Sequence, residues 1–110
     1  MTLTHINSGN YQKEVKESKL PVIIDFYADW CGPCRMMAPL FEELSETYKG
    51  RLKFAKLNTD EENAIAGQYG ISGIPCLVVV YQGKEAGRIV GYVPKAMLEQ
   101  KIDAILAAKK

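Results

Sequence analysis

The strongest chemical signal in the chain is a pair of cysteines, Cys31 and Cys34, which flank Gly32 and Pro33 and follow Trp30. Two intervening residues let the two sulfur atoms approach each other, so the pair can cycle between a dithiol and a disulfide. The pair lies between an apolar run and a stretch with helical periodicity, which places it at a helix N-terminus. Unpaired N–H groups and the positive end of the helix dipole stabilise a thiolate there. We therefore expect the pKa of Cys31 to lie below the free-thiol value of about 8.5.

Metal binding is the alternative chemistry for such a pair. Zinc usually takes four ligands, most often from two cysteine pairs or from one pair and two histidines. The further candidates in this chain are His5 and Cys76, both far from the pair in sequence. We therefore favour redox chemistry and expect neither a metal nor a cofactor. A metal or cluster site shared between two chains, and a scaffold that only holds a partner, remain the alternatives.

The composition narrows the class of protein. The chain has 110 residues, 47% hydrophobic and 25% charged, which suits a single domain over residues 1–110. Fourteen basic and thirteen acidic residues leave a net charge of +1, so we expect neither nucleic acid nor a membrane as partner. The first residues lack the pattern of a signal peptide, which predicts a cytoplasmic protein. Cysteines in that compartment serve catalysis or metal binding more often than a structural disulfide.

Hydrophobic periodicity predicts alternating strands and helices. Strands are expected over 2–6, 21–28, 52–58, 76–81 and 85–90. Helices are expected over about 7–16, 34–48 and 62–69, and a last one opens after Val93. Residues 82–84, which include Gly83, are typical of a tight hairpin turn. The order β-α-β-α-β-α-β-β-α predicts an α/β fold with a mixed central sheet flanked by helices.

Two of the expected helices carry informative residues. Pro39 removes one backbone donor inside the helix over 34–48, so we expect a kink there and the end of the helix at Gly50. The last helix is expected to bury an apolar face made of Met97, Leu98, Ile102, Ile105 and Leu106.

The segment over 22–39, which contains the cysteine pair, resembles the active-site segment of the thioredoxin family. The resemblance continues through 55–58, 69–75, the Gly83 turn and Gly91, and it covers essentially the whole chain without an insertion. It implies the thioredoxin fold and the activity of a protein-disulfide reductase that maintains the redox state of the cell.

The resemblance also implies a role for each residue of the cysteine motif. Cys31 attacks a substrate disulfide to form a mixed disulfide, and Cys34 then attacks Cys31 and releases the reduced substrate. Gly32 and Pro33 tune the redox potential and favour reduction over oxidation. The partners would be disulfide-containing proteins and a thioredoxin reductase, NADPH- or ferredoxin-linked, because the chain has no nucleotide or flavin motif. A monomer is expected.

Asp25 is the charged residue that the predicted strand over 21–28 has to accommodate. Its apolar neighbours imply that both faces of this strand are covered, and ionised carboxylates are seldom fully buried unless they are paired. Lys56, on the apolar side of the next strand, is the candidate partner. The resemblance implies that Asp25 takes the proton of Cys34 through water, while Lys56 adjusts the pKa of Asp25. Burial raises that pKa and an ammonium lowers it, so the net sign stays open, as does a purely structural ion pair.

Residues around Pro75 form the expected docking surface. The resemblance implies that the Ile74–Pro75 bond is cis and that its loop lies opposite the cysteine pair. Together with Trp30 and Gly91, this loop would form a flat, weakly polar patch for the extended backbone of substrates. From the sequence alone, Trp30 could equally be a partly buried core aromatic.

The chain departs from the family pattern at two positions. Tyr27 stands where many members have Trp, and Cys76 stands where Thr is usual. Cys76 opens an apolar strand whose two faces are expected to be covered, so we predict a buried thiol with a raised pKa that packs as a small hydrophobe. A regulatory disulfide is the alternative for Cys76.

Overall fold

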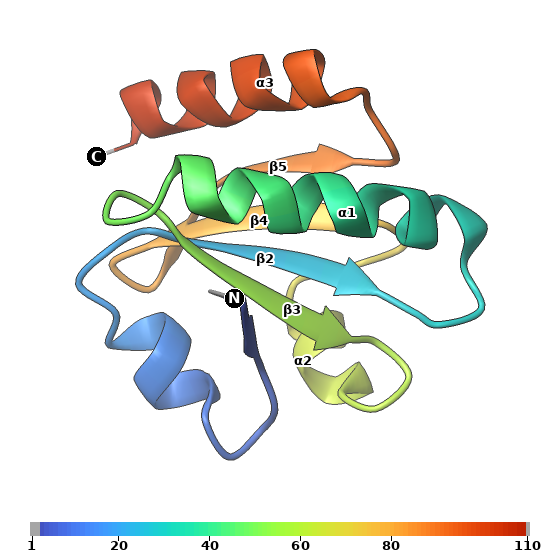
Figure 1. The fold of residues 1–110 in the computed structure, drawn as a ribbon. Helices are drawn as coiled ribbons and strands as arrows, with labels where there is room; N and C mark the ends of the chain where they lie inside the picture. Colours follow the sequence, from blue (N-terminus) through green and yellow to red (C-terminus); the bar gives the residue numbers. More distant parts are fainter. Residues whose placement is uncertain (1–2, 110) are drawn as a thin grey trace.

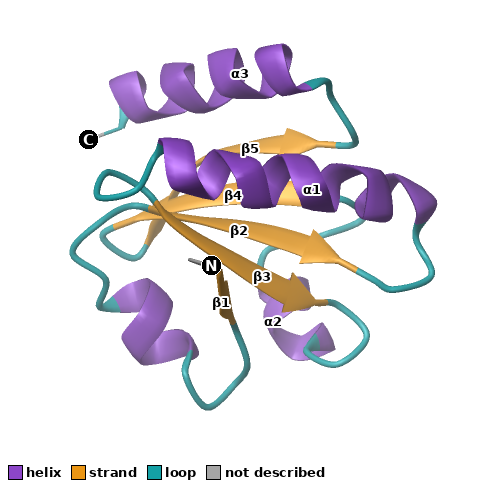
Figure 2. Cartoon of the chain, in the orientation of Figure 1, coloured by secondary structure: helices purple, strands orange, loops and turns teal. Residues whose placement is uncertain are grey.

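Five strands form the predicted sheet in a computed structural model that describes residues 3–109 (Figures 1 and 2). They are β1 (Leu3–His5), β2 (Val22–Tyr27), β3 (Lys53–Asn58), β4 (Cys76–Tyr81) and β5 (Lys84–Val90), in the spatial order β1-β3-β2-β4-β5. β1 and β2 pair with β3 in parallel, and β4 runs antiparallel to both β2 and β5. The mixed sheet is therefore confirmed; the expected start of the first strand, Thr2, lies outside the described residues.

Helices cover both faces of this sheet. α1 (Gly32–Thr47) and α3 (Lys95–Ala108) lie over one face, and the short η1 (Gln12–Lys16) and α2 (Asn63–Gln68) lie under the other (Figure 1). η1 is a short stretch of π-helix, so the first helix is shorter than predicted, whereas the order of elements is as predicted. No helix within residues 3–109 is long and apolar enough to cross a membrane.

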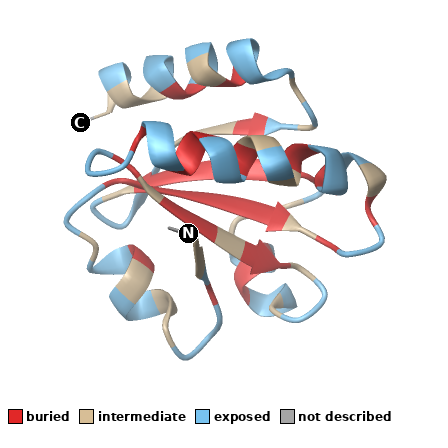
Figure 3. Cartoon of the chain, viewed as in Figure 1, coloured by how far each residue is buried: buried red, intermediate tan, exposed pale blue. Residues whose placement is uncertain are grey.

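β2 lies at the centre of the sheet and contributes to two core layers. Val22, Ile24 and Phe26 face η1 and α2, while Ile23 faces α1 and α3. β2 and β4 are buried along nearly their whole length, which Figure 3 shows as the red of these strands. Asp25 has the parity of Ile23, so its side chain points to the face that α1 covers. Coverage of both faces explains why the strand is apolar at nearly every position.

α1 begins two residues earlier than predicted, at Gly32, with Cys31 as its N-cap. Pro33 lies in the first turn of α1, where backbone N–H groups have no partner within the helix. The N–H that proline lacks therefore costs the helix no hydrogen bond. Pro39 lies inside the helix, which continues to Thr47 as expected. The helix therefore starts directly at the cysteine pair, and the kink at Pro39 stays a prediction.

The apolar face of α3 differs from the prediction at one residue. Leu98 and Ile102 are fully buried, and Ile105 and Leu106 pack against the same cluster. Met97 is 46% exposed, so its assignment to the buried face was wrong. Successive helical residues are about 100° apart, which leaves residue 97 at the margin of a stripe centred on 98, 102 and 105.

The hairpin between β4 and β5 is tighter than predicted. Gln82 and Gly83 both have positive φ, 54° and 78°, and Tyr81 pairs directly with Lys84. Positive φ at both central residues is the type I′ geometry, whose twist matches the right-handed twist of the flanking strands. β5 accordingly begins at Lys84 and not at residue 85.

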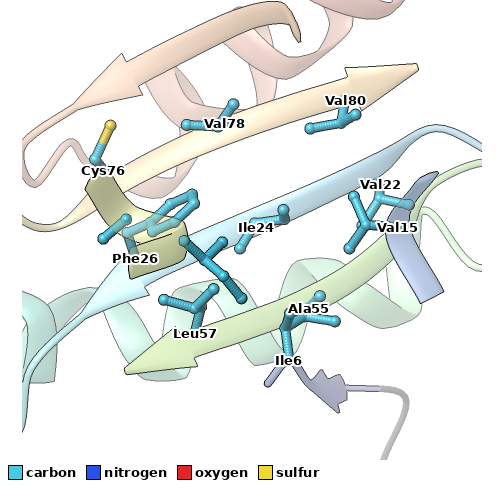
Figure 4. Close-up of a cluster of buried hydrophobic side chains, with 12 residues drawn as sticks. Ile6, Val15, Val22, Ile24, Phe26, Ala55, Leu57, Cys76, Val78 and Val80 are labelled. Carbon is cyan, nitrogen blue, oxygen red and sulfur yellow. The ribbon is translucent and has the colours of Figure 1, made fainter. Parts of the chain in front are cut away.

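Cys76 lies in the core layer under the sheet, as predicted. Its side chain clusters with Phe26 and Val78 on the face away from α1, and the residue is 1% exposed (Figure 4). Burial raises the pKa of this thiol. The sheet itself therefore separates Cys76 from the helix that carries the cysteine pair.

Close packing of α3 on β5 predicts a cost for any side chain at Gly87. A Cβ at this position would lie 2.9–3.2 Å from side-chain atoms of Ile105, so Gly87→Ala should lower the free energy of unfolding by about 1–3 kcal/mol. Gly67→Ala is the matched control, because Gly67 lies in α2 with no atom within 4 Å of the new Cβ. The control should be neutral or stabilised by up to about 1 kcal/mol in urea denaturation. Equal effects of the two substitutions would contradict this packing.

Burial of Cys76 predicts slow reaction with a thiol reagent. With Cys31 and Cys34 oxidised, the native protein should label slowly and the denatured protein at once, because the Cys76 thiol is inaccessible and its pKa is raised by burial. Cys76→Thr is the control and should give no signal in either state. Rapid labelling of the native protein would instead favour a regulatory thiol.

Candidate active site

The cysteine pair is positioned by the first turn of α1. Cys31 and Cys34 are joined as a disulfide, with their Cα atoms 5.2 Å apart. The backbone N–H of Cys34 donates a hydrogen bond to Sγ of Cys31 at 3.2 Å. In the reduced protein this N–H and the helix dipole both favour negative charge on that sulfur. The predicted placement of the pair at a helix N-terminus is confirmed.

The loop before β4 lies against this pair. The Ile74–Pro75 peptide bond is cis, as the family resemblance implied, and the carbonyl oxygen of Ile74 lies 3.8 Å from Sγ of Cys31. The backbone N–H of Gly91 donates to the carbonyl of Pro75 at 2.8 Å. Gly91 has a φ of 86°, a conformation that favours glycine. The end of β5 is thereby tied to the loop that faces Cys31.

Trp30 lies on the surface beside the pair. It is 69% exposed, and its Nε1 donates to Oδ2 of Asp60 at 3.0 Å. The alternative of a core aromatic is therefore wrong. Val90 and Tyr92, on either side of Gly91, are also exposed and apolar, and they were not predicted as site residues. The only feature of the sequence that could have indicated them is their position next to Gly91.

Asp25 is fully buried between the sheet and α1. Its residue is 0% exposed, and neither carboxylate oxygen has a hydrogen-bond partner within residues 3–109. Burial raises the pKa of Asp25 to about 7, and the Lys56 ammonium lowers it only in part. The net shift of the pKa of Asp25, whose direction the sequence left open, is therefore upward. Desolvation of the carboxylate outweighs the attraction of the nearby cation.

Lys56 lies beside Asp25 without pairing with it. The two residues are direct neighbours across the parallel pairing of β2 and β3. The Nζ of Lys56 nevertheless lies 4.5 Å from the centroid of the Tyr27 ring, and no ion pair joins it to Asp25 in the described part of the chain. The alternative of a satisfied structural ion pair is therefore wrong.

A solvent-accessible cavity of about 320 Å³ opens beside Cys34 and Lys56. Its wall includes Cys34 and Ala38 of α1 and Tyr27 and Lys56 of the sheet. At its rim, Nη1 of Arg35 donates to the carbonyl of Asp29 at 2.8 Å. Cys34 therefore borders a cavity to which neither Ile74 nor Pro75 contributes.

The described residues offer no metal-binding cluster beside the cysteine pair. No three His, Cys, Asp or Glu side chains within residues 3–109 lie close enough to hold a metal ion together. The groups that the site brings together are two sulfur atoms, a buried carboxyl and a lysine.

Comparison with known proteins agrees with this site. A family model described as Thioredoxin matches residues 2–104. The chain is 43% identical over 98 residues to Thioredoxin 1 of Nostoc sp., an alignment that covers 89% of this chain and 92% of the relative. It is 47% identical over 94 residues to Thioredoxin of Chlorobaculum thiosulfatiphilum, covering 86% and 87%. It is 45% identical over 101 residues to the chloroplastic M-type thioredoxin of Chlamydomonas reinhardtii, covering 92% of this chain and 72% of the relative.

These relatives match nearly the whole chain, and the fold places a redox-active cysteine pair at the start of a helix. The chain belongs to the thioredoxin family of protein-disulfide oxidoreductases.

Proposed function

We propose that this protein reduces disulfides in other proteins, with Cys31 as the attacking and Cys34 as the resolving cysteine. The observation that carries the proposal is the Cys31–Cys34 disulfide at the N-terminus of α1, with the Cys34 N–H directed at Sγ of Cys31. In the reduced protein, the Cys31 thiolate attacks a substrate disulfide, a mixed disulfide forms and one substrate sulfur leaves as a thiolate. Cys34 then attacks Sγ of Cys31, and the second substrate sulfur leaves. Two electrons pass to the substrate, and the chain ends as the Cys31–Cys34 disulfide.

The positions of the two sulfur atoms support this division of roles. Sγ of Cys31 lies beside the carbonyl of Ile74, on the side of the Ile74–Pro75 loop. Cys34 lines the cavity on the other side, next to Lys56. A substrate that docks on the loop therefore meets Cys31 first, and Cys34 is left to attack from behind.

The surface around Cys31 suits the backbone of an extended peptide. Trp30 is exposed, Ile74 and Gly91 are half-buried, and the peptide bond before Pro75 is cis. We assign these residues to substrate docking because they surround Cys31 without presenting a charged side chain of their own. Such a surface accepts many sequences, since it contacts backbone and apolar area more than particular polar groups.

Asp25 is proposed as the base that receives the proton of Cys34, with water from the cavity as the carrier. A general base works best when its pKa lies near the working pH, and burial raises the pKa of Asp25 to about 7. Both carboxylate oxygens are free of hydrogen-bond partners in residues 3–109, so an incoming proton displaces no existing contact. Lys56 tunes this acidity from its place on β3.

The oxidised pair has to be reduced again by another protein. We assign that step to a thioredoxin reductase, NADPH- or ferredoxin-linked, because two cysteines and a carboxyl contain no source of electrons beyond the pair itself. We further propose that the chain acts as a monomer in the cytoplasm, where Gly32 and Pro33 between the cysteines set a potential suited to reduction.

The two cysteines should fail in different ways when they are replaced. Cys31→Ser should no longer accelerate the reduction of insulin by dithiothreitol and should form no adduct, because the attacking sulfur is gone. Cys34→Ser should still attack and remain covalently bound to substrate, a product visible on a non-reducing gel. Cys76→Thr is the control and should keep near-normal activity, since Cys76 is buried on the other face of the sheet. An adduct on the Cys31→Ser protein would reverse the roles.

Removing the base should slow the second step of the reaction. In the wild type, release of the mixed disulfide should accelerate as the pH rises through about 7, where Asp25 loses its proton. Asp25→Asn should lose this inflection and resolve roughly tenfold more slowly or worse, as measured by rapid quench. Identical rates in the two proteins between pH 6 and 8 would refute the assignment.

The same variant supplies its own folding control. A carboxyl whose pKa is raised from 3.8 to about 7 binds its proton more tightly in the folded chain. The wild type therefore loses stability as the pH rises through this window. Asp25→Asn should be more stable than the wild type above pH 7, by up to about 4 kcal/mol, and the difference should vanish below about pH 4. A slow but stable variant excludes misfolding as the cause.

A further inference from the structure

Two side chains on one face of the sheet, those of Asp25 and Tyr27, compete for the positive charge of Lys56. Asp25 and Tyr27 are two residues apart on β2, so they point to the same face, and Lys56 is the direct neighbour of Asp25 on β3. From this position the ammonium can reach either the carboxyl or the ring. Its Nζ lies 4.5 Å from the ring centroid of Tyr27, within the range of a cation–π contact.

The carboxyl of Asp25 is left without a hydrogen-bond partner in the described part of the chain, although a lysine lies on the adjacent strand. A buried carboxylate and a nearby ammonium normally attract each other strongly. An interaction that holds the ammonium elsewhere is therefore needed, and the Tyr27 ring is the contact that Lys56 makes.

We infer that Tyr27 is a positioning residue whose ring holds the Lys56 ammonium, so that no ion pair forms with Asp25 and the carboxylate stays free to accept the proton of Cys34. The inference rests on the proposed role of Asp25 as a base. It also gives a physical reason for an aromatic residue at position 27, because the face of the ring attracts a cation.

In the described part of the chain, two further charged residues, Asp29 and Arg35, border the cavity together with Lys56. On α1, Cys34 and Arg35 border the same cavity, and the Arg35 guanidinium is bound to the Asp29 carbonyl. On β4, Leu77 is the neighbour of Asp25, and Cys76 lies on the opposite face. Asp29 and Glu61 act on Tyr27, whose hydroxyl pKa is raised chiefly by burial, so the ring stays neutral at the working pH.

The pKa of Asp25, followed by the ¹³C chemical shift of its carboxyl in the reduced protein, tests the inference directly. Tyr27→Leu removes the ring face and frees Lys56 to approach Asp25, so this pKa should fall by about half a unit or more. Tyr27→Phe keeps the ring without the hydroxyl and should leave the pKa unchanged. Lys56→Met removes the cation and should raise the pKa, because the ammonium lowers it in the wild type.

The double variant separates the action of the ring on Lys56 from a change in burial. If Tyr27 acts through Lys56, Tyr27→Leu should have no effect on the Asp25 pKa in the Lys56→Met protein. An equal fall with and without Lys56 would mean that the ring only keeps water out, which would overturn the inference. No fall in Tyr27→Leu, or a fall in Tyr27→Phe, would overturn it as well.

The rate of mixed-disulfide release distinguishes this inference from the proposed role of Asp25. In Tyr27→Leu, the pH at which release accelerates should move down together with the measured pKa of Asp25. A pKa that moves while the rate profile does not would refute the base assignment and leave the positioning by Tyr27 intact. A constant pKa refutes the positioning by Tyr27 whatever the rates are.

Discussion

An ionisable carboxyl that is fully buried, with no hydrogen-bond partner within residues 3–109, is the constraint on which the arrangement of this protein depends. Asp25 has a raised pKa because the covered faces of β2 keep bulk water away from its charge. α1 and α3 cover one face, and η1 and α2 cover the other. The two-layer core is therefore more than a source of stability, since it sets the electrostatic environment in which the cysteine pair works.

The topology of the sheet brings the working groups to one edge. β2 ends beside the cysteine pair, and the antiparallel pairing of β4 places the Ile74–Pro75 loop next to that end. β5 then returns in the opposite direction, so Gly91 arrives at the same edge and bonds to Pro75. Three segments far apart in sequence thus meet around Cys31. Each lies in a loop at the end of a strand of the sheet, and pairing of that strand fixes the position of the loop.

At the two positions where the chain departs from the family pattern, one side chain points away from this site and the other points toward it. Cys76 follows the cis peptide bond directly, yet its side chain turns to the far face of the sheet and packs with Phe26 and Val78. A third thiol is thereby tolerated close in sequence to the site without entering it. Tyr27 turns to the near face, where its ring contacts the Lys56 ammonium beside Asp25. Successive side chains of a strand point to opposite faces of the sheet, so the position within the strand decides whether a substitution alters the core packing or the active site.

The sequence by itself determined the order of strands and helices, the placement of the cysteine pair at a helix N-terminus and the burial of Cys76, because hydrophobic period and local chemistry are visible in one dimension. Only the tertiary structure decided that Lys56 contacts Tyr27 instead of Asp25, that the pKa of Asp25 is raised, and that Trp30 is exposed. The exposure of Met97, at the margin of its helical stripe, likewise depended on how α3 settles on β5. Each of these outcomes is a balance between opposing effects whose sizes depend on distances across strands and helices. The sequence alone does not give those distances, because they separate residues that are far apart along the chain.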